Sequence, residues 1–343
     1  MKLSIIIAIY KVEKYVHACL ESIFRQGLDD DAFEVILIND GTPDNSMEVI
    51  QDIIDKHDNI IVVNQENQGL SVVHNVGIAM AKGEYILMPD SDDLLIDNSL
   101  SKILEVALST QADLVVADFL IMNDEEINNI QTISQNEFEM KEKTGEELFI
   151  EDLNPHQCYV WRTLFRRDFL ISNHLTFVPG IFIQDVPFTH ECYIKAKKCI
   201  RTPWLLNIYR RGHDSATSSF SVKKAKDYCT AVAKTWELTH IEGLSPKLQY
   251  KLREDIFISF SIIILLTVHV IEDAADRTEI VDFLRRSAPD LSFNNCTKQR
   301  IISFMFRHFP HLYIHSRYIY GRIIEDTIRP FYNHKIKKII GRS

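Results

Sequence analysis

Two carboxylates separated by one residue, in Asp90-Ser91-Asp92, are the most direct sign of chemistry in this sequence. Hard cations such as Mn²⁺ and Mg²⁺ prefer oxygen ligands, and a cation held by carboxylates neutralises the charge of a departing diphosphate. Aspartate is also favoured at the start of a helix, so residues 90–93 have a second interpretation as a helix cap. The position directly after an apolar segment favours a Mn²⁺ or Mg²⁺ site.

Another carboxylate, Asp40, follows a second apolar segment, within the turn-rich run Asn39–Ser46. A carboxylate at the end of a strand can accept hydrogen bonds from a base or a ribose. It can equally be a turn residue, because Asn, Asp, Gly and Pro all favour turns. Asp44, in the same run, is predicted to structure the loop or to cap the helix that follows.

These residues need a scaffold that gathers the ends of strands, and the first 117 residues have its pattern. Apolar runs predict strands at Leu3–Ile9, Phe33–Ile38, Ile60–Val63, Glu84–Met88 and Leu114–Ala117. Apolar residues at helical spacing predict helices at Val12–Phe24, Met47–Lys56, Leu70–Ala81 and Ser99–Leu108. This alternation is typical of an α/β fold with a mostly parallel sheet and flanking helices. Ligands of such sheets bind beyond the carboxyl ends of the strands, where these carboxylates are expected.

The pattern changes twice further along the chain. Residues 118–215 predict short strands and turns with one helix near Gly145–Glu151, whereas the chain from Ser221 onward has an almost wholly helical pattern. We therefore predict an α/β domain at residues 1–217 and a helical C-terminal region at residues 218–343. The apolar run Ile256–Ile271 is shorter than the roughly 20 residues that span a bilayer, so it predicts a buried or interfacial helix.

Four segments of the sequence resemble a family 2 glycosyltransferase: SIIIAIYKVEKYVHACLESI, ILINDGTPDNS, NQGLSVVHNVGIAMAKGEYILMPDSDD and GIFIQDVPF. The resemblance covers roughly residues 1–217, and Gln68–Asp93 is its most specific part. It implies a GT-A fold, a nucleotide-sugar donor with UDP favoured, Mn²⁺ or Mg²⁺, and inversion at the anomeric carbon. It also implies an acceptor hydroxyl on a glycan or lipid-linked saccharide, in the biosynthesis of a cell-surface polysaccharide.

The resemblance implies donor-binding roles for eight residues: Ala8, Tyr10, Asp40, His74, Asp90, Ser91, Arg210 and His213. Within this set, Ala8 and Tyr10 would line the base pocket and Asp40 would bind the base. Asp92, together with Asp90, would hold the metal at the diphosphate.

Asp185, in the pair Gln184-Asp185, would by the same resemblance be the catalytic base that takes the proton of the acceptor hydroxyl. In a single-displacement inversion, the base must lie on the face of the donor sugar opposite the leaving group. We therefore expect the base to come from a segment distant from the metal site, as Asp185 does. Four positions depart from the family pattern: Lys11 replaces the usual Asn, His74 an Arg, Thr163 a Lys and Gln184 a Glu. These departures bear on the choice of donor and leave the metal site and the base in place.

The segment Tyr209-Arg210-Arg211, with His213, resembles the part of the family that covers the diphosphate or the acceptor. Arginine suits phosphate, but a solvated basic turn explains the segment equally well. Trp161 and Trp204 could stack on a sugar ring, although a tryptophan in a core or an interface is the commoner case.

Charge is distributed unevenly along the chain. Residues 298–343 carry ten Lys and Arg against two acidic residues, a net charge of +8, which leaves −18 on residues 1–297 of a chain with net charge −10. The acidic body disfavours nucleic acid, and the basic, aromatic end favours an anionic membrane surface. Packing of a helical subdomain and a homodimer interface are the alternatives.

The six cysteines lack regular spacing and predict reduced, buried thiols, consistent with a cytoplasmic protein at the inner face of the plasma membrane.

The sequence lacks the motifs of several other classes of enzyme. A dinucleotide-binding oxidoreductase needs a glycine-rich turn after the first strand, and Ala8–Val12 contains no glycine. The P-loop, GxSxG and HExxH motifs do not occur. Two alternatives stay open: a non-catalytic scaffold with a glycosyltransferase-like fold, and a sugar nucleotidyltransferase.

Overall fold

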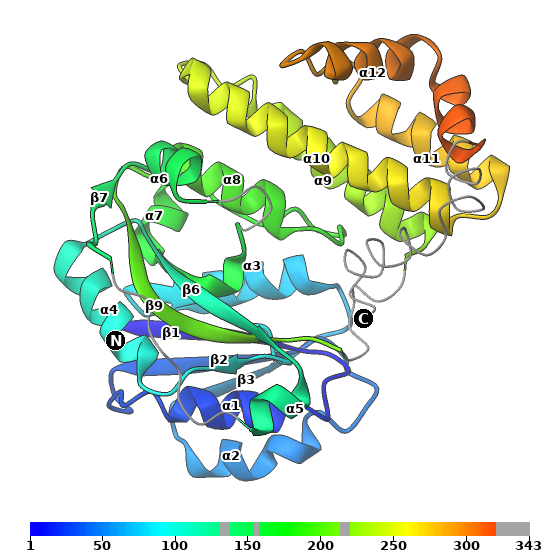
Figure 1. Cartoon of the computed structure of the whole chain (residues 1–343). Helices are drawn as coiled ribbons and strands as arrows, with labels where there is room; N and C mark the ends of the chain where they lie inside the picture. The colour runs from blue at the N-terminus through cyan, green and yellow to red at the C-terminus, as the bar shows by residue number, and fades with distance from the viewer. Residues whose placement is uncertain (130–137, 154–157, 213–219, 320–343) are drawn as a thin grey trace. The chain divides into compact units, whose positions relative to one another are not determined.

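The structure, a computed structural model, describes residues 1–129, 138–153, 158–212 and 220–319. The chain folds as two compact units, whose elements are labelled in Figure 1. The first unit contains Met1–Gly180 and Phe188–Arg211. The second contains Ile181–Pro187 and the described part of Gly212–Ser343.

One mixed sheet organises the first unit. Within the described residues its nine strands are β1 (Leu3–Ile9), β2 (Phe33–Asn39), β3 (Ile60–Asn64), β4 (Tyr85–Leu87), β5 (Leu94–Leu95), β6 (Leu114–Met122), β7 (Glu142–Lys143), β8 (Thr163–Arg166) and β9 (Cys199–Arg210). The order is β3-β2-β1-β4-β8-β6-β9-β5, with β7 paired to β9. The half β3-β2-β1-β4 is parallel, as predicted, and β6 is parallel to β9. The remaining pairings, made by β8, β5 and β7, are antiparallel, so the parallel pattern does not extend over the whole sheet.

Helices flank this sheet (Figure 1). They are α1 (Val16–Phe24), η1 (Glu48–Ile50), α2 (Gln51–Lys56), α3 (Leu70–Met80), α4 (Ser99–Thr110), α5 (Asp124–Asn128), α6 (Gly145–Glu151), η2 (Val160–Arg162), α7 (Arg167–Ser172) and α8 (Asp185–Lys195). The predicted helix from Val12 begins four residues late, at Val16. Lys11 has a left-handed φ of 57°, and hydrogen bonds from its N–H and that of Val12 to Thr42 and Ser46 hold this stretch as a loop.

Both faces of the central strands are buried, which explains their continuous apolar sequences. In β1, Leu3, Ile5 and Ile7 pack into a core with α1 and α4. Ile6 points to the other face, against α3. There a Cβ added to Gly77 would lie 2.4 Å from the Cγ2 of Ile6, so the close approach of helix and strand requires glycine.

Two long elements in residues 118–215 were not predicted. α8 buries the polar Thr189 and His190 together with Phe188 and Cys192, so its sequence lacks a clear apolar face. β9 runs for 12 residues, and its register with β6 shifts between Val116 and Phe119. Such a bulge interrupts the alternation by which strands are recognised.

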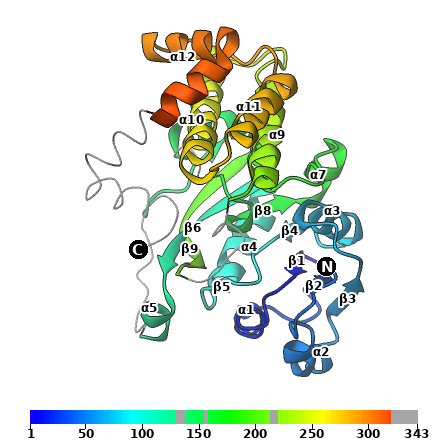
Figure 2. The ribbon, with the colours of Figure 1, turned by 90° about the vertical axis from the view of Figure 1, so that its right-hand side faces the viewer.

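The second unit is helical, as predicted. Its helices are α9 (Val222–Leu238), α10 (Pro246–Val270), α11 (Ala274–Ser287) and α12 (Thr297–His308), followed by a helical stretch at residues 310–319. Figures 1 and 2 show α9, α10 and α11 side by side. Ser221, Ser245 and Asp273 cap three of these helices through their side-chain oxygens.

The apolar run Ile256–Ile271 forms most of α10 and is largely buried, with Ile256, Phe260 and Ile263 in the core of the second unit. None of the helices among the described residues combines the length and apolar character needed to cross a membrane.

All six cysteines are free thiols; five are buried as predicted, and Cys296 is exposed because it precedes α12 at the surface.

Candidate functional site

Three adjacent parallel strands end at the same edge of the sheet and deliver the predicted site residues there. Tyr10 follows β1, Asp40 follows β2, and Asp90 lies a short loop beyond β4. The N–H of Asp40 donates to the carbonyl of Ile9 at 3.1 Å, which continues the strand pairing to the edge. The side chain of Tyr10 is 41% exposed, and that of Ala8 is half-buried.

Three carboxylates converge in the turn after β4. The carboxylate cluster consists of Asp90, Asp92 and Asp93, each with an oxygen within 4.8 Å of the others. The N–H of Asp93 donates to the carbonyl of Asp90 at 3.2 Å, which closes a tight turn around the buried Ser91. Hard oxygen donors at this spacing suit Mn²⁺ or Mg²⁺.

Asp93, which directly follows the DxD motif, is the member of the cluster that was not predicted as a metal ligand. Its side chain is 1% exposed, and its Oδ1 accepts the N–H of Arg210 at 2.8 Å. Its Oδ2 is buried and has no hydrogen-bond partner among the described residues. Burial, and then the charges of Asp90 and Asp92, raise the pKa of the Asp93 carboxyl well above its usual range. A cation shared by the cluster would satisfy the unpaired oxygen and offset this repulsion, so the residues fit a divalent metal.

Arg210 stands at the end of β9 and holds the carboxylate turn in place. Its Nε–H donates to the carbonyl of Asp92 at 3.0 Å, and its guanidinium pairs with Asp124 at the start of α5. The guanidinium carbon lies 5.0 Å from the centroid of the Tyr15 ring, and the residue is 8% exposed. The structure therefore places Arg210 at the predicted site, with its donors directed to the protein.

Asp40 organises the loop that precedes α3. Its Oδ1 accepts the side-chain amide of Gln65 at 2.7 Å and the N–H of Gln68 at 2.9 Å, and its Oδ2 accepts the N–H of Gly69 at 2.9 Å. Gly41 beside it has a φ of 63°, and a Cβ there would lie 3.0 Å from the backbone nitrogen of Asn67. The loop thus depends on both residues for its path along the edge of the sheet.

Asp44 ties the two loops around Tyr10 and Asp40 together, as predicted for a loop-structuring residue. Its Oδ1 accepts the hydroxyls of Thr42 and Ser46, each at 2.6 Å, and its Oδ2 accepts the N–H of Glu13 at 3.2 Å. Burial acts to raise the pKa of the Asp44 carboxyl, but the hydrogen bonds from Ser46, Thr42 and the backbone outweigh burial and lower that pKa.

His74 lies inside the protein, on α3. It is 3% exposed and its ring centroid lies 4.7 Å from that of Phe177, while the neighbouring Asn75 exchanges hydrogen bonds of 2.9 and 2.8 Å with the Phe177 backbone. Burial lowers the pKa of His74 to about 3. The imidazole is therefore neutral near pH 7, and does not supply the charge of the arginine that the family usually has.

A row of aromatic rings flanks the carboxylate cluster. The ring centroids of Tyr159 and Trp161 are 4.8 Å apart, and those of Trp161 and Tyr209 are 5.8 Å apart, both nearly parallel. Burial, with the charges of the carboxylate cluster acting in the same direction, raises the pKa of Tyr209 to about 12. Trp161 is buried in this row and Trp204 packs against the core of the first unit.

Asp185 and His213 are the remaining predicted site residues. Asp185 begins α8 and belongs, with the buried Gln184, to the second unit. There Lys224 of α9 lies 4.8 Å from the ring centroid of Phe182. Burial raises the pKa of Tyr228 to about 12, and the charge of Asp185 acts in the same direction, so Asp185 lies close to α9. His213 falls outside the described residues.

Comparisons with known proteins agree with this geometry. Residues 4–172 match the model of glycosyl transferase family 2. The uncharacterized glycosyltransferase EpsJ of Bacillus subtilis (strain 168) is 33% identical over 216 residues, an alignment that spans 62% of each chain.

Solved structures share the fold over almost the whole chain. Residues 1–349 of TarS from S. aureus, in complex with UDP-GlcNAc, superpose with a TM-score of 0.72 at 18% identity, covering 94% of this chain and 92% of that one. The mannosyltransferase PcManGT from Pyrobaculum calidifontis, in complex with GDP-Man and Mn²⁺, has a TM-score of 0.56 at 12% identity and covers 93% of this chain and 87% of its own. With their matching sequence, residues 4–172 belong to glycosyl transferase family 2, and the chain, with its mixed sheet and flanking helices, has the GT-A fold.

Proposed function

We propose that this protein is an inverting glycosyltransferase that moves a sugar from a nucleotide diphosphate sugar to a hydroxyl of a glycan or lipid-linked acceptor. UDP-sugars are the favoured donors, in line with the UDP-GlcNAc complex of TarS. The acceptor would be a cell-surface polysaccharide under construction, at the cytoplasmic side of the plasma membrane. Residues 1–217 would be the catalytic domain.

The observation that carries this proposal is the carboxylate cluster at the sheet edge that also bears Asp40 and Tyr10. Within the described part of the chain, the buried Oδ2 of Asp93 in this cluster has no hydrogen-bond partner. Asp90 and Asp92, joined by Asp93, would hold Mn²⁺ or Mg²⁺. A divalent cation, when bound, acts as a Lewis acid that stabilises the charge of the departing diphosphate.

The positions of the side chains support the remaining donor roles that we propose. Tyr10 offers an exposed ring beside Asp40 for the base, and Ala8 leaves room next to it. Arg210 would order the carboxylate turn through the carbonyl of Asp92. Ser91 keeps that turn compact, and His74 contributes by packing because burial keeps it neutral.

Asp185 would act as the general base for the acceptor hydroxyl. A carboxylate in the first turn of a helix interacts favourably with the helix dipole, and α8 begins with this residue. Its segment packs on α9 through Phe182 and Lys224. Proton transfer to a carboxylate held in this way typically accelerates a reaction by about 10²–10⁴-fold.

The proposal is tested by release of nucleoside diphosphate from a panel of UDP-, GDP- and dTDP-sugars with Mn²⁺, with and without a glycan acceptor. Asp185→Asn should bind donor with unchanged affinity and lose at least about 100-fold in transfer. Asp168→Asn is the matched control, because Asp168 is 82% exposed on α7, and it should behave as wild type. Full transfer by Asp185→Asn would rule out the proposed base.

The same panel, repeated with added pyrophosphate, separates the alternatives. A sugar nucleotidyltransferase would consume pyrophosphate and release nucleoside triphosphate from the donor. A scaffold without catalysis would show no turnover with any donor, although it folds normally.

A further inference from the structure

Residues 297–319 form an acid-free stretch in an acidic protein. They contain Lys298, Arg300, Arg307 and Arg317 with three histidines, and no Asp or Glu, although the whole chain has a net charge of −10. The structure describes the whole stretch, as α12 and the helical residues 310–319.

The exposed residues of α12 include large apolar side chains beside basic ones. Phe306 points inward and is buried in the core of the second unit, whereas Ile301 is 59% and Phe304 is 55% exposed. Residues 301, 304 and 308 share one face because they are spaced by three and four positions. The Phe304 ring is tilted against the rings of His308 and Phe309, whose centroids lie 4.7 and 6.0 Å away. Leu312, on the next helical stretch, is 57% exposed. A cluster of exposed apolar side chains of this kind marks a surface that meets a partner.

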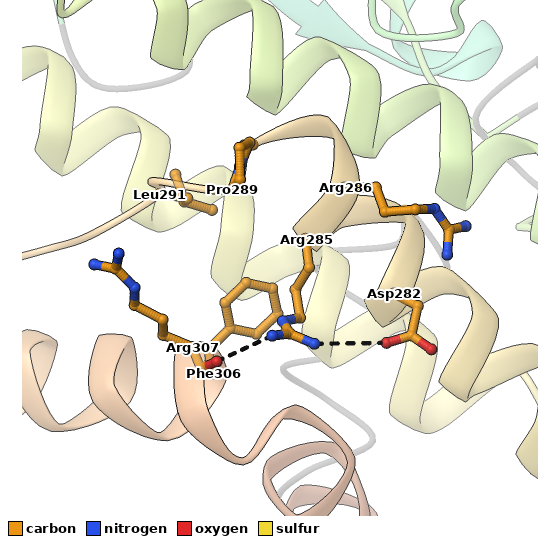
Figure 3. A pocket seen from close by; sticks show the side chains of 8 residues that line it. Asp282, Arg285, Arg286, Pro289, Leu291, Phe306 and Arg307 are labelled. Carbon is orange, nitrogen blue, oxygen red and sulfur yellow. Dashed lines mark hydrogen bonds and ion pairs between the residues drawn. The ribbon is translucent and has the colours of Figure 1, made fainter.

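A basic hollow of about 430 Å³ adjoins this face, between the ends of α11 and α12. Leu291, Pro289 and Phe306 supply apolar walls, and three arginines line it (Figure 3). Arg285 bridges the helices, donating to the carbonyl of Arg307 at 3.1 Å and lying 3.9 Å from Asp282.

The other two guanidinium groups of the hollow are available to a ligand. Arg286 and Arg307 are exposed and have no ion-pair partner in the part of the chain that the structure describes, and Figure 3 shows them extending from different sides of the hollow. Two helix C-termini contribute about half a negative charge each, and Asp282 contributes one more. Three arginines exceed this sum by about one positive charge, so the hollow favours an anion.

We propose that α12 and residues 310–319 lie on an anionic phospholipid bilayer, with a headgroup phosphate bound in the hollow. Ile301, Phe304 and Leu312 would enter the boundary between headgroups and acyl chains. Arginine suits phosphate, and apolar walls suit the attached glycerol and acyl carbons. The inference deepens the proposed function, because it names the membrane contact and its residues, yet it can fail independently of donor binding.

Flotation of the full chain with phosphatidylcholine vesicles, with and without phosphatidylglycerol, tests the proposal. Wild type should bind only the vesicles that contain phosphatidylglycerol. The variants Ile301→Ser with Phe304→Ser, and Arg286→Gln with Arg307→Gln, should each weaken binding by about tenfold or more. Tyr250→Ser is the matched apolar control, because Tyr250 is 55% exposed on α10. Lys223→Gln with Lys234→Gln removes two exposed positive charges elsewhere in the second unit. Both controls should bind as wild type.

The proposal would be overturned by equal binding of phosphatidylcholine alone, by unchanged binding of both test variants, or by an equal loss in the controls. Conversion of a dimer to a monomer by the serine variants, with vesicle binding intact, would identify the face as a contact between copies and equally overturn it. UDP binding with Mn²⁺ should be unchanged in every variant. That measurement separates failure of this inference from failure of the donor site.

Discussion

The backbone N–H of Arg210 donates a hydrogen bond of 2.8 Å to the Oδ1 of Asp93, across 117 positions of the sequence. This bond fixes the end of β9 to the turn that carries the carboxylate cluster. It occupies one oxygen of Asp93 and leaves the other buried and without a hydrogen bond among the described residues. The proposed metal site thus depends on two distant segments rather than on the DxD motif alone.

Asp93→Asn should weaken Mn²⁺ binding by at least about tenfold, because it removes one charged oxygen ligand while its amide oxygen can still accept the Arg210 N–H. Calorimetric titration of Mn²⁺ checks this. Asp97→Asn, at a carboxylate 55% exposed and paired with Arg25, is the control and should leave the affinity unchanged. Equal Mn²⁺ affinity in Asp93→Asn and wild type would contradict a role of Asp93 as a ligand and would leave only Asp90 and Asp92 as carboxylate ligands.

Arg210→Gln should lower kcat/KM for the donor by about 10–100-fold, because it removes a charged donor to the Asp92 carbonyl. Asp124→Asn should cost less than about threefold, since the contacts of Arg210 with Asp92 and Asp93 remain. Steady-state kinetics with a fixed acceptor measure both variants. A larger loss in Asp124→Asn than in Arg210→Gln would contradict the positioning role of Arg210.

Much of the fold was predictable because β1, β2 and β4 are buried on both faces and therefore have continuous apolar sequences. The gathering of Asp40 and Asp90 at one edge followed from that topology. The role of Asp93 did not, since it depends on β9, whose bulge hides the strand pattern. The burial of His74 likewise depends on Phe177, a contact between distant segments that no local spacing reveals.

Asp44→Ala should destabilise the protein by about 1 kcal/mol near pH 7, because it removes the acceptor that joins the loops around Tyr10 and Asp40. The hydrogen bonds lower the pKa of Asp44 in the folded state, so its contribution is present above the unfolded pKa and is lost as pH falls through the folded pKa. Urea midpoints of the two proteins should therefore converge below about pH 4. A constant difference across this range would contradict the assignment.

His74→Leu should make the protein more tolerant of acid. Burial lowers the pKa of His74 to about 3, so between its ordinary pKa of about 6.5 and about 3 the unfolded chain binds a proton that the folded chain does not. In wild type the free energy of unfolding therefore decreases by up to about 1.4 kcal/mol for each unit by which the pH is lowered. His74→Leu lacks this contribution. Thermal unfolding between about pH 7 and about pH 4 measures the slope, with His57→Leu as a control at a less buried histidine. Parallel slopes in His74→Leu and wild type would place the imidazole in contact with water.

The central claim, that the carboxylate cluster binds a donor nucleotide through a divalent cation, is tested most directly by calorimetric titration of UDP into wild type and Asp92→Asn. Each titration is made once with Mn²⁺ and once with EDTA. We expect binding by wild type with Mn²⁺ that disappears with EDTA, and at least about tenfold weaker binding by Asp92→Asn. UDP binding that is the same with EDTA and in Asp92→Asn would contradict the account.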